Sequence, residues 1–146
     1  MILISNINDF NPQHIILSEK VRNTVIDNCL FTRICYSTPF VTFNSLYIKF
    51  DIKNMILEKN FNKYKCKFNL AENKNFLNQI KNLETDILNL YNCNKQKQFS
   101  LYEQLEQGYF KVFSNSNKKL DNIVLKISGL WEGIEFYGIT CKFLGN

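Results

Sequence analysis

The chain has 146 residues, of which 45% are hydrophobic and 14% aromatic, and it carries a net charge of +5. This length predicts a single domain, 1–146, that can bury a core without disulfides or metal. The composition excludes collagen-like and disordered chains, and no apolar run approaches the ~18–20 residues of a membrane span. The first residues lack the features of a signal peptide, so we expect an intracellular protein that is not secreted and has no membrane partner.

Alternating polar and apolar residues predict three strands in the first half of the chain. These strands cover residues 30–36, 46–52 and 63–70, and Pro39 breaks or bends the chain after the first of them. Residues 53–62 are predicted to form a long hairpin loop that joins the second strand to the third.

The period changes to that of a helix at Asn73, a residue that suits the N-cap position. Apolar residues then recur at helical spacing and predict one amphipathic helix around 74–91, with an apolar stripe wide enough to pack on a sheet. The next segment, 92–107, is polar, and its only helical signal is a short second helix around Leu101 and Leu105.

Three shorter strands are predicted after Gly108, over residues 109–113, 124–131 and 136–143. A segment rich in turn-forming residues, 114–119, is predicted to be the loop between the first two. Three strands, a helix and three strands predict a mainly β (α+β) fold. The expected architecture is a small antiparallel barrel of about five or six strands, OB-like, with the helix inserted.

The positive charge is concentrated in one part of the chain. Eight lysines between Lys49 and Lys81 face three carboxylates, whereas the segments before and after this stretch are balanced. A local positive field of this kind attracts polyanions. Lysine is also favoured by AT-rich codons, which the many Asn and Ile residues indicate, so an ordinary solvated surface is the alternative interpretation.

With the apolar residues of each strand assigned to the core, the opposite face combines lysines with aromatic rings. Lysines contact phosphates, and rings stack on unpaired bases without a sequence code. This combination predicts a surface for single-stranded nucleic acid, and the exposed rings are its more telling half because codon bias explains them less well. The candidate binding residues are Tyr47, Lys49, Lys65, Lys67, Tyr109, Lys111, Phe113, Lys126, Trp131, Phe136 and Lys142.

Two features near the last turn have alternative interpretations. Strict alternation from Leu125 places Trp131 on the core side, whereas a bulge at Gly129 would turn it outward into the binding face. Glu132 and Glu135 flank the turn that follows. We expect both to be solvated turn residues rather than a pair of catalytic carboxylates.

Patterns for catalysis, metal binding or disulfides are absent from the sequence. The only histidine is His14, and the five cysteines are widely spaced without a Cys-x-x-Cys pair. Cys66 and Cys141 fall on apolar strand faces, where a free thiol acts as a small hydrophobic group. The common phosphate-loop, dinucleotide, nucleophile-elbow and zinc-protease motifs do not occur. We therefore expect a binding protein and not an enzyme, with no cofactor and no metal.

The C-terminal segment carries a resemblance to a known family. The residues LKISGLWEG at 125–133 and YGITCKF at 137–143 form a pattern that resembles the closing hairpin of OB-fold single-stranded DNA-binding proteins of large nucleocytoplasmic DNA viruses. Those proteins are similar to the single-stranded DNA-binding proteins of T7-like phages. The resemblance implies a viral replication or recombination protein that coats single-stranded DNA in the infected host cell, with replication proteins as further partners.

The sequence departs from this family in one respect and leaves other functions open. The phage proteins end in an acidic tail that recruits partners, whereas this chain ends in FLGN. The alternative function is a viral structural or protein–protein interaction module. Protein interfaces are enriched in Tyr and Phe but depleted in Lys, so the lysine on every predicted strand favours nucleic acid. The same face chemistry also suits RNA, and homo-oligomerisation stays open.

Overall fold

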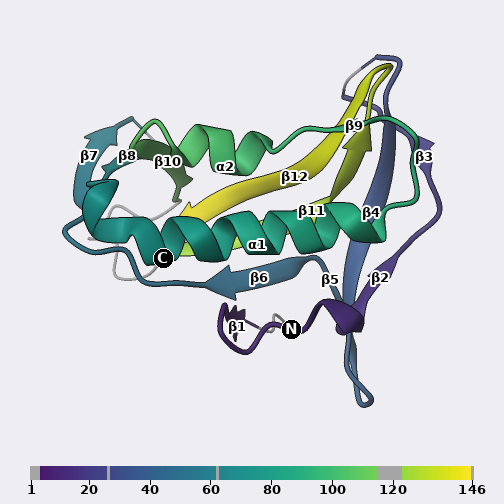
Figure 1. Cartoon of the computed structure of the whole chain (residues 1–146), viewed down its shortest axis with the longest axis horizontal. Coiled ribbons are helices and arrows are strands. Elements are labelled where there is room, and N and C mark those ends of the chain that lie inside the picture. Colours follow the sequence, from purple (N-terminus) through teal and green to yellow (C-terminus); the bar gives the residue numbers. More distant parts are fainter. Residues whose placement is uncertain (1–3, 26, 62, 115–122, 146) are drawn as a thin grey trace.

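The computed structural model describes residues 4–25, 27–61, 63–114 and 123–145. This part of the chain is mainly β, with one long helix and one short helix (Figure 1). The elements in chain order are β1 (Ile4–Asn6), η1 (Pro12–His14), β2 (Ile15–Leu17), β3 (Val21–Arg22), β4 (Leu30–Ser37), β5 (Thr42–Asn44), β6 (Leu46–Lys49), β7 (Ile56–Asn60), β8 (Lys63–Lys67), η2 (Ala71–Asn73), α1 (Lys74–Leu90), β9 (Gln96–Lys97), α2 (Ser100–Leu105), β10 (Tyr109–Phe113), β11 (Ile123–Glu132) and β12 (Phe136–Gly145).

The predicted amphipathic helix is confirmed as α1, and the short second helix as α2. Apolar residues of α1 at helical spacing, such as Phe76, Ile80 and Ile87, are buried, and so are both leucines of α2. Within the described residues, neither helix is long and apolar enough to cross a membrane. The predicted loop 114–119 lies outside these residues beyond Ser114.

Asn73 precedes α1 as predicted, but its side chain makes no capping hydrogen bond. The buried amide instead accepts a hydrogen bond from the Lys53 backbone N–H at 2.7 Å and donates to the Lys53 carbonyl at 3.1 Å. It also donates to the Asn69 carbonyl at 2.8 Å. The start of α1 is therefore tied to the chain between β6 and β7.

The prediction of a hairpin loop over 53–62 is wrong. Half of this segment is β7, which pairs antiparallel with β8. The strand before it, β6, pairs with β11 and β1 instead of β8. Alternation could not reveal β7 because it is an edge strand in which only Leu57 is half-buried and the other residues are exposed.

The described strands form one large sheet whose main path runs β1-β6-β11-β12-β10-β8-β7. The second half of β11 also pairs with β4, which in turn pairs with β2, β3 and β5. Three pairs are parallel, namely β1 with β6, β10 with β12 and β9 with β12. The sheet is therefore not purely antiparallel, contrary to the prediction from the sequence. Side-chain alternation could not reveal this, because it carries no information on strand direction. Among the described strands no pairing joins the ends of the path, β1 and β7, so the sheet is open.

Both helices lie on one face of this sheet (Figure 1). Phenylalanine rings link these layers: Phe76 of α1 lies 4.8 Å from Phe50, which directly follows β6, and Phe110 of β10 lies 4.2 Å from Phe143 of β12, measured between ring centroids. The fully buried Ile48 and Leu125 continue this core. Core residues therefore take the helix-covered face, and alternation directs the remaining residues of these strands to the opposite face.

Glu132 is not the solvated turn residue that the sequence predicts. Its side chain is buried and accepts hydrogen bonds from Lys95 Nζ at 2.9 Å, the Tyr91 hydroxyl at 2.7 Å and Lys20 Nζ at 3.1 Å. The hydrogen bond from Lys95, supported by those from Tyr91 and Lys20, lowers the pKa of the Glu132 carboxyl to about 2. This carboxylate joins the end of α1, the segment after it and the N-terminal segment to the β11–β12 hairpin.

Candidate nucleic-acid interface

A row of lysines crosses four neighbouring strands on the sheet face opposite the helices. Lys126 of β11 pairs with Lys142 of β12, and Lys111 of β10 pairs with Lys65 of β8. The parallel register that aligns Val112 with Phe143 places Lys111 beside Lys142 and so joins the two pairs. Neighbouring strands lie ~4.8 Å apart, and like charges directly opposite each other destabilise a sheet. The lysines of this row therefore repel one another, and a bound anion would relieve this repulsion.

The charge of the whole face is strongly one-sided. The outward positions of β6, β7, β8, β10, β11 and β12 carry seven lysines and one carboxylate, and the residues are Lys49, Lys63, Lys65, Lys67, Lys111, Lys126, Lys142 and Glu58. The single ion pair of this face in the described chain joins Lys67 Nζ to Glu58 at 2.8 Å. Codon bias supplies lysines, but it does not collect seven of them on one face with a single carboxylate.

Aromatic rings lie among these lysines. Tyr109 and Phe113 of β10 are about one-third exposed, at 36% and 38%. An ammonium group lies over each ring: Lys65 Nζ is 4.4 Å from the Tyr109 centroid, and Lys63 Nζ is 5.1 Å from that of Phe113. A base that stacks on either ring would displace the lysine, which is then free to contact a phosphate.

At the other end of the lysine row, Tyr47 also lies beneath a lysine ammonium group. It is the cross-strand partner of Lys126, whose Nζ lies 5.8 Å from the ring centroid. Rings and lysines thus alternate over a surface that spans β6 to β8. Nine of the eleven sequence-predicted residues share this surface, which we call the lysine face: Tyr47, Lys49, Lys65, Lys67, Tyr109, Lys111, Phe113, Lys126 and Lys142.

The lysine face is hollowed where β8 and β10 meet the β7–β8 turn. This hollow has a volume of about 640 Å³ and is lined by Asn60, Phe61, Lys63, Tyr64, Lys65, Tyr109 and Lys111. Sequence reasoning did not select Phe61, since it lies in a turn, where alternation gives no signal. It is 91% exposed and has a φ of 55°, which is an uncommon conformation for a bulky side chain.

The remaining predicted residues, Trp131 and Phe136, lie elsewhere. The register of β11 against β12 shifts between Ile127 and Gly129, so a bulge turns Trp131 away from the core. Lys142 lies six positions after Phe136 in β12, which corresponds to roughly 20 Å along a strand. The outward alternative for Trp131 is thus the correct one, but its ring stands well apart from the lysine row.

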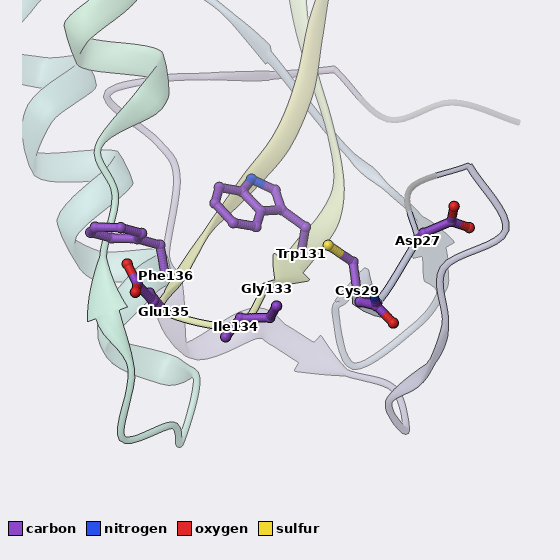
Figure 2. A pocket seen from close by; sticks show the side chains of 8 residues that line it. Asp27, Cys29, Trp131, Gly133, Ile134, Glu135 and Phe136 are labelled. Atoms are coloured by element: carbon purple, nitrogen blue, oxygen red, sulfur yellow. The ribbon is translucent and has the colours of Figure 1, made fainter.

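Trp131 and Phe136 line a second hollow, which has a volume of about 420 Å³ (Figure 2). The acidic residues Asp27 and Glu135 lie on either side of it, and Cys29 points its thiol toward the indole. Carboxylates repel phosphates, so this corner differs in chemistry from the lysine face. We call it the acidic corner.

The described residues contain no cluster of His, Cys, Asp or Glu that could hold a metal ion. All five cysteines are free. Burial raises the pKa of the Cys66 and Cys141 thiols to about 12, so neither is a thiolate at neutral pH. The prediction that these two cysteines lie on apolar faces is confirmed for Cys66, which is fully buried, and Cys141 is half-buried against the core.

Comparison with known proteins yields no match: no family model, no curated protein and no solved structure is similar to this chain at a significant level. The interpretation of the site therefore rests on its residues and their geometry.

Proposed function

We propose that this protein binds single-stranded DNA without sequence preference, through the lysine face. Lysines would neutralise phosphates, while Tyr109, Phe113 and Tyr47 would stack on bases. This mode of binding needs no metal, cofactor or catalytic group. The resemblance of the closing hairpin adds the expectation that the bound strands are intermediates of viral replication or recombination.

The row of adjacent lysines is the observation that carries this proposal. Lys126, Lys142, Lys111 and Lys65 stand side by side without a carboxylate among them, and Glu58 follows only on the edge strand. A fold that holds four like charges on neighbouring strands sacrifices stability unless a polyanion binds there. Rings within the row add a preference for unpaired bases, whose faces are accessible only outside a duplex.

We further propose that the sheet is an OB-like barrel in which one strand is interrupted. β6 and β7 follow each other in the chain, yet they lie at opposite ends of the path β6-β11-β12-β10-β8-β7. If residues 46–60 are counted as one bent strand, the path returns to its own beginning, as it does in a five-stranded Greek-key barrel. Phe50, in the interruption, supports this curvature by its ring contacts with Phe76 and Phe143. Helix α1 then connects the second and third strands, β8 and β10.

The location of the 640 Å³ hollow supports the same proposal. OB-folds bind oligonucleotides on the face of their second and third strands, beside the loop that joins the first two strands. In the proposed correspondence these are β8, β10 and the β7–β8 turn, and the hollow is lined by residues of all three.

Fluorescence anisotropy with labelled oligo-dT at two salt concentrations tests the proposal. Affinity should fall with salt, with a slope of about −0.7 for each phosphate contacted, because bound lysines displace counterions from the strand. The double variant Lys111→Gln/Lys142→Gln should bind more weakly and show a smaller slope. Lys74→Gln, on the exposed surface of α1, is the matched control and should leave both unchanged.

Three outcomes would contradict the proposal. Wild-type affinity that is absent or indifferent to salt removes nucleic-acid binding and favours a protein-interaction module. Equal losses in the double variant and the Lys74→Gln control would place the contacts off the lysine face. Tighter binding to a duplex than to oligo-dT would exclude base stacking on the rings as a source of affinity. A parallel titration with oligo-U distinguishes DNA from RNA.

A further inference from the structure

The acidic corner is an apolar hollow with unpaired carboxylates beside it. Its lining is mostly apolar and includes Trp131, Phe136 and Ile134, of which Ile134 is 77% exposed. The carboxylates of Asp27 and Glu135 take part in no ion pair with any described residue. An occupant of this hollow should therefore carry an apolar group with positive charges beside it.

A group of this kind exists in the protein itself, at the β7–β8 turn. Phe61 is almost fully exposed, and its φ of 55° lies in the left-handed region. Lys59 and Lys63, at the facing ends of β7 and β8, are exposed and form no ion pair within the described chain. An aromatic ring between two cations is the counterpart of an apolar hollow between two carboxylates.

We propose that Phe61 of one copy inserts into the acidic corner of a second copy, with Lys59 and Lys63 of the first copy near Asp27 and Glu135 of the second. Burial of the ring and of the hollow's apolar lining would drive the contact, and the four charges would set its orientation.

The position of the two surfaces determines the kind of assembly. The β7–β8 turn and the β11–β12 hairpin tip lie at opposite ends of the long axis (Figure 1). One copy therefore cannot fill its own hollow, and end-to-end contact places the turn of one copy in the hollow of the next. The contact is heterologous, and repeated use produces an open row of copies.

This association needs no nucleic acid, but its consequence for DNA rests on the proposed function. The hollow of the lysine face lies directly beside Phe61. A row of copies would bring each such hollow to a junction with the next copy. Neighbouring proteins would then stabilise each other on a single strand, and binding would be cooperative.

Sedimentation velocity of the full chain without nucleic acid tests the proposal directly. The wild-type sedimentation coefficient should rise with protein concentration, and added salt should reduce the rise. Phe61→Ser should lose the concentration dependence. Phe40→Ser is the matched control, because Phe40 lies in another hairpin turn and is also 91% exposed but has no lysine nearby in the sequence.

A mixing experiment distinguishes this contact from any other interface. Phe61→Ser retains an intact acidic corner, while Asp27→Lys/Glu135→Lys retains an intact ring. Each variant alone should be monomeric, and an equimolar mixture should form a dimer that grows no further. A mixture that stays monomeric, or a wild type that is monomeric at every concentration, overturns the proposal.

Further readouts separate misfolding and failure of the proposed function from failure of this contact. Circular dichroism and the thermal midpoint of each variant verify the fold, and Phe61→Leu, which keeps an apolar side chain, should retain part of the association. If Phe61→Ser and Phe40→Ser reduce association equally, the contact is wrong. Self-association without affinity for oligo-dT would refute the proposed function and leave this inference standing.

Discussion

The indole of Trp131 occupies the space that a side chain on Gly138, its cross-strand partner, would need. A Cβ atom on Gly138 would lie 2.8 Å from Cζ2 of the ring. On the same sheet face, a Cβ on Gly129 would lie 2.2 Å from the Thr32 carbonyl oxygen and 2.6 Å from the Phe31 ring. The two glycines therefore let Phe31 and Trp131 lie flat against the strands after the bulge.

These contacts predict different costs for two alanine substitutions. Gly129→Ala should lower the free energy of unfolding by about 3 kcal/mol, because the Thr32 carbonyl belongs to a paired strand and cannot move aside. Gly138→Ala should cost about 1 kcal/mol, because the half-buried indole can swing outward. Urea denaturation measures both, and the fluorescence of the only tryptophan should change in Gly138→Ala.

Gly133→Ala is the control for this pair, since the nearest atom to its added Cβ would be 3.5 Å away. It should be close to neutral. If Gly129→Ala were as mild as Gly133→Ala, the tight packing of β4 against the bulge would be wrong.

Removing one lysine from the row should affect stability and binding in opposite directions. Lys142 has lysine neighbours on both sides. Lys142→Gln should therefore raise the free energy of unfolding by about 0.3 kcal/mol while reducing the salt slope of oligo-dT binding by about 0.7. Paired urea and anisotropy measurements check this, and a loss of both stability and affinity would mean that Lys142 has a structural role instead.

The rings of β10 should contribute to binding rather than to stability. Tyr109→Leu and Phe113→Leu preserve apolar contact with the sheet but remove the flat surface on which a base stacks. Each should weaken oligo-dT binding by about 1–3 kcal/mol and change the free energy of unfolding little. Phe40→Leu, a substitution of a ring outside the lysine face, should leave binding unchanged. Equal affinities in all three variants would exclude stacking on β10.

The lowered pKa of Glu132 predicts that the free energy of unfolding falls in acid. Its pKa is about 2 in the folded protein and about 4.5 in an unfolded chain. The folded state therefore favours the ionised form, so this contribution is complete above pH 4.5 and is lost as the pH falls toward 2. The loss should be on the order of 2–3 kcal/mol.

Urea midpoints between pH 7 and pH 2 measure this contribution. Glu132→Gln should be less stable than the wild type at pH 7, and the difference should shrink as the pH approaches 2. Glu135→Gln, which changes an exposed carboxyl of the same turn, is the control and should track the wild type throughout. A constant difference between Glu132→Gln and the wild type would show that the ion pairs contribute nothing through ionisation.

Most secondary structure was predictable because each element has its own periodic signal. The boundaries of β4, β10, β11 and β12 agree with prediction within two residues, and α1 begins directly after Asn73. β7 and the short strands before residue 30 were missed, because edge strands bury few side chains and need no apolar alternation. Alternation gives no strand order for a different reason: neighbours such as β6 and β11 are distant in sequence.

The candidate site was likewise predictable only in part. Alternation placed Lys111 and Lys65 on the outward side of their strands, but it could not show that they are neighbours. Nor could it show that Trp131 lies apart from them, since the bulge before it and the strand length decide its position.

By itself, the sequence determined which side of most strands faces the core, where the long helix lies and which residue types reach the solvent, since these properties depend on local periodicity. Only the tertiary structure decided which lysines stand side by side, that Glu132 is buried among its partners and that Trp131 turns outward. Those outcomes depend on strand register and on contacts between residues far apart in the chain, which no local pattern encodes.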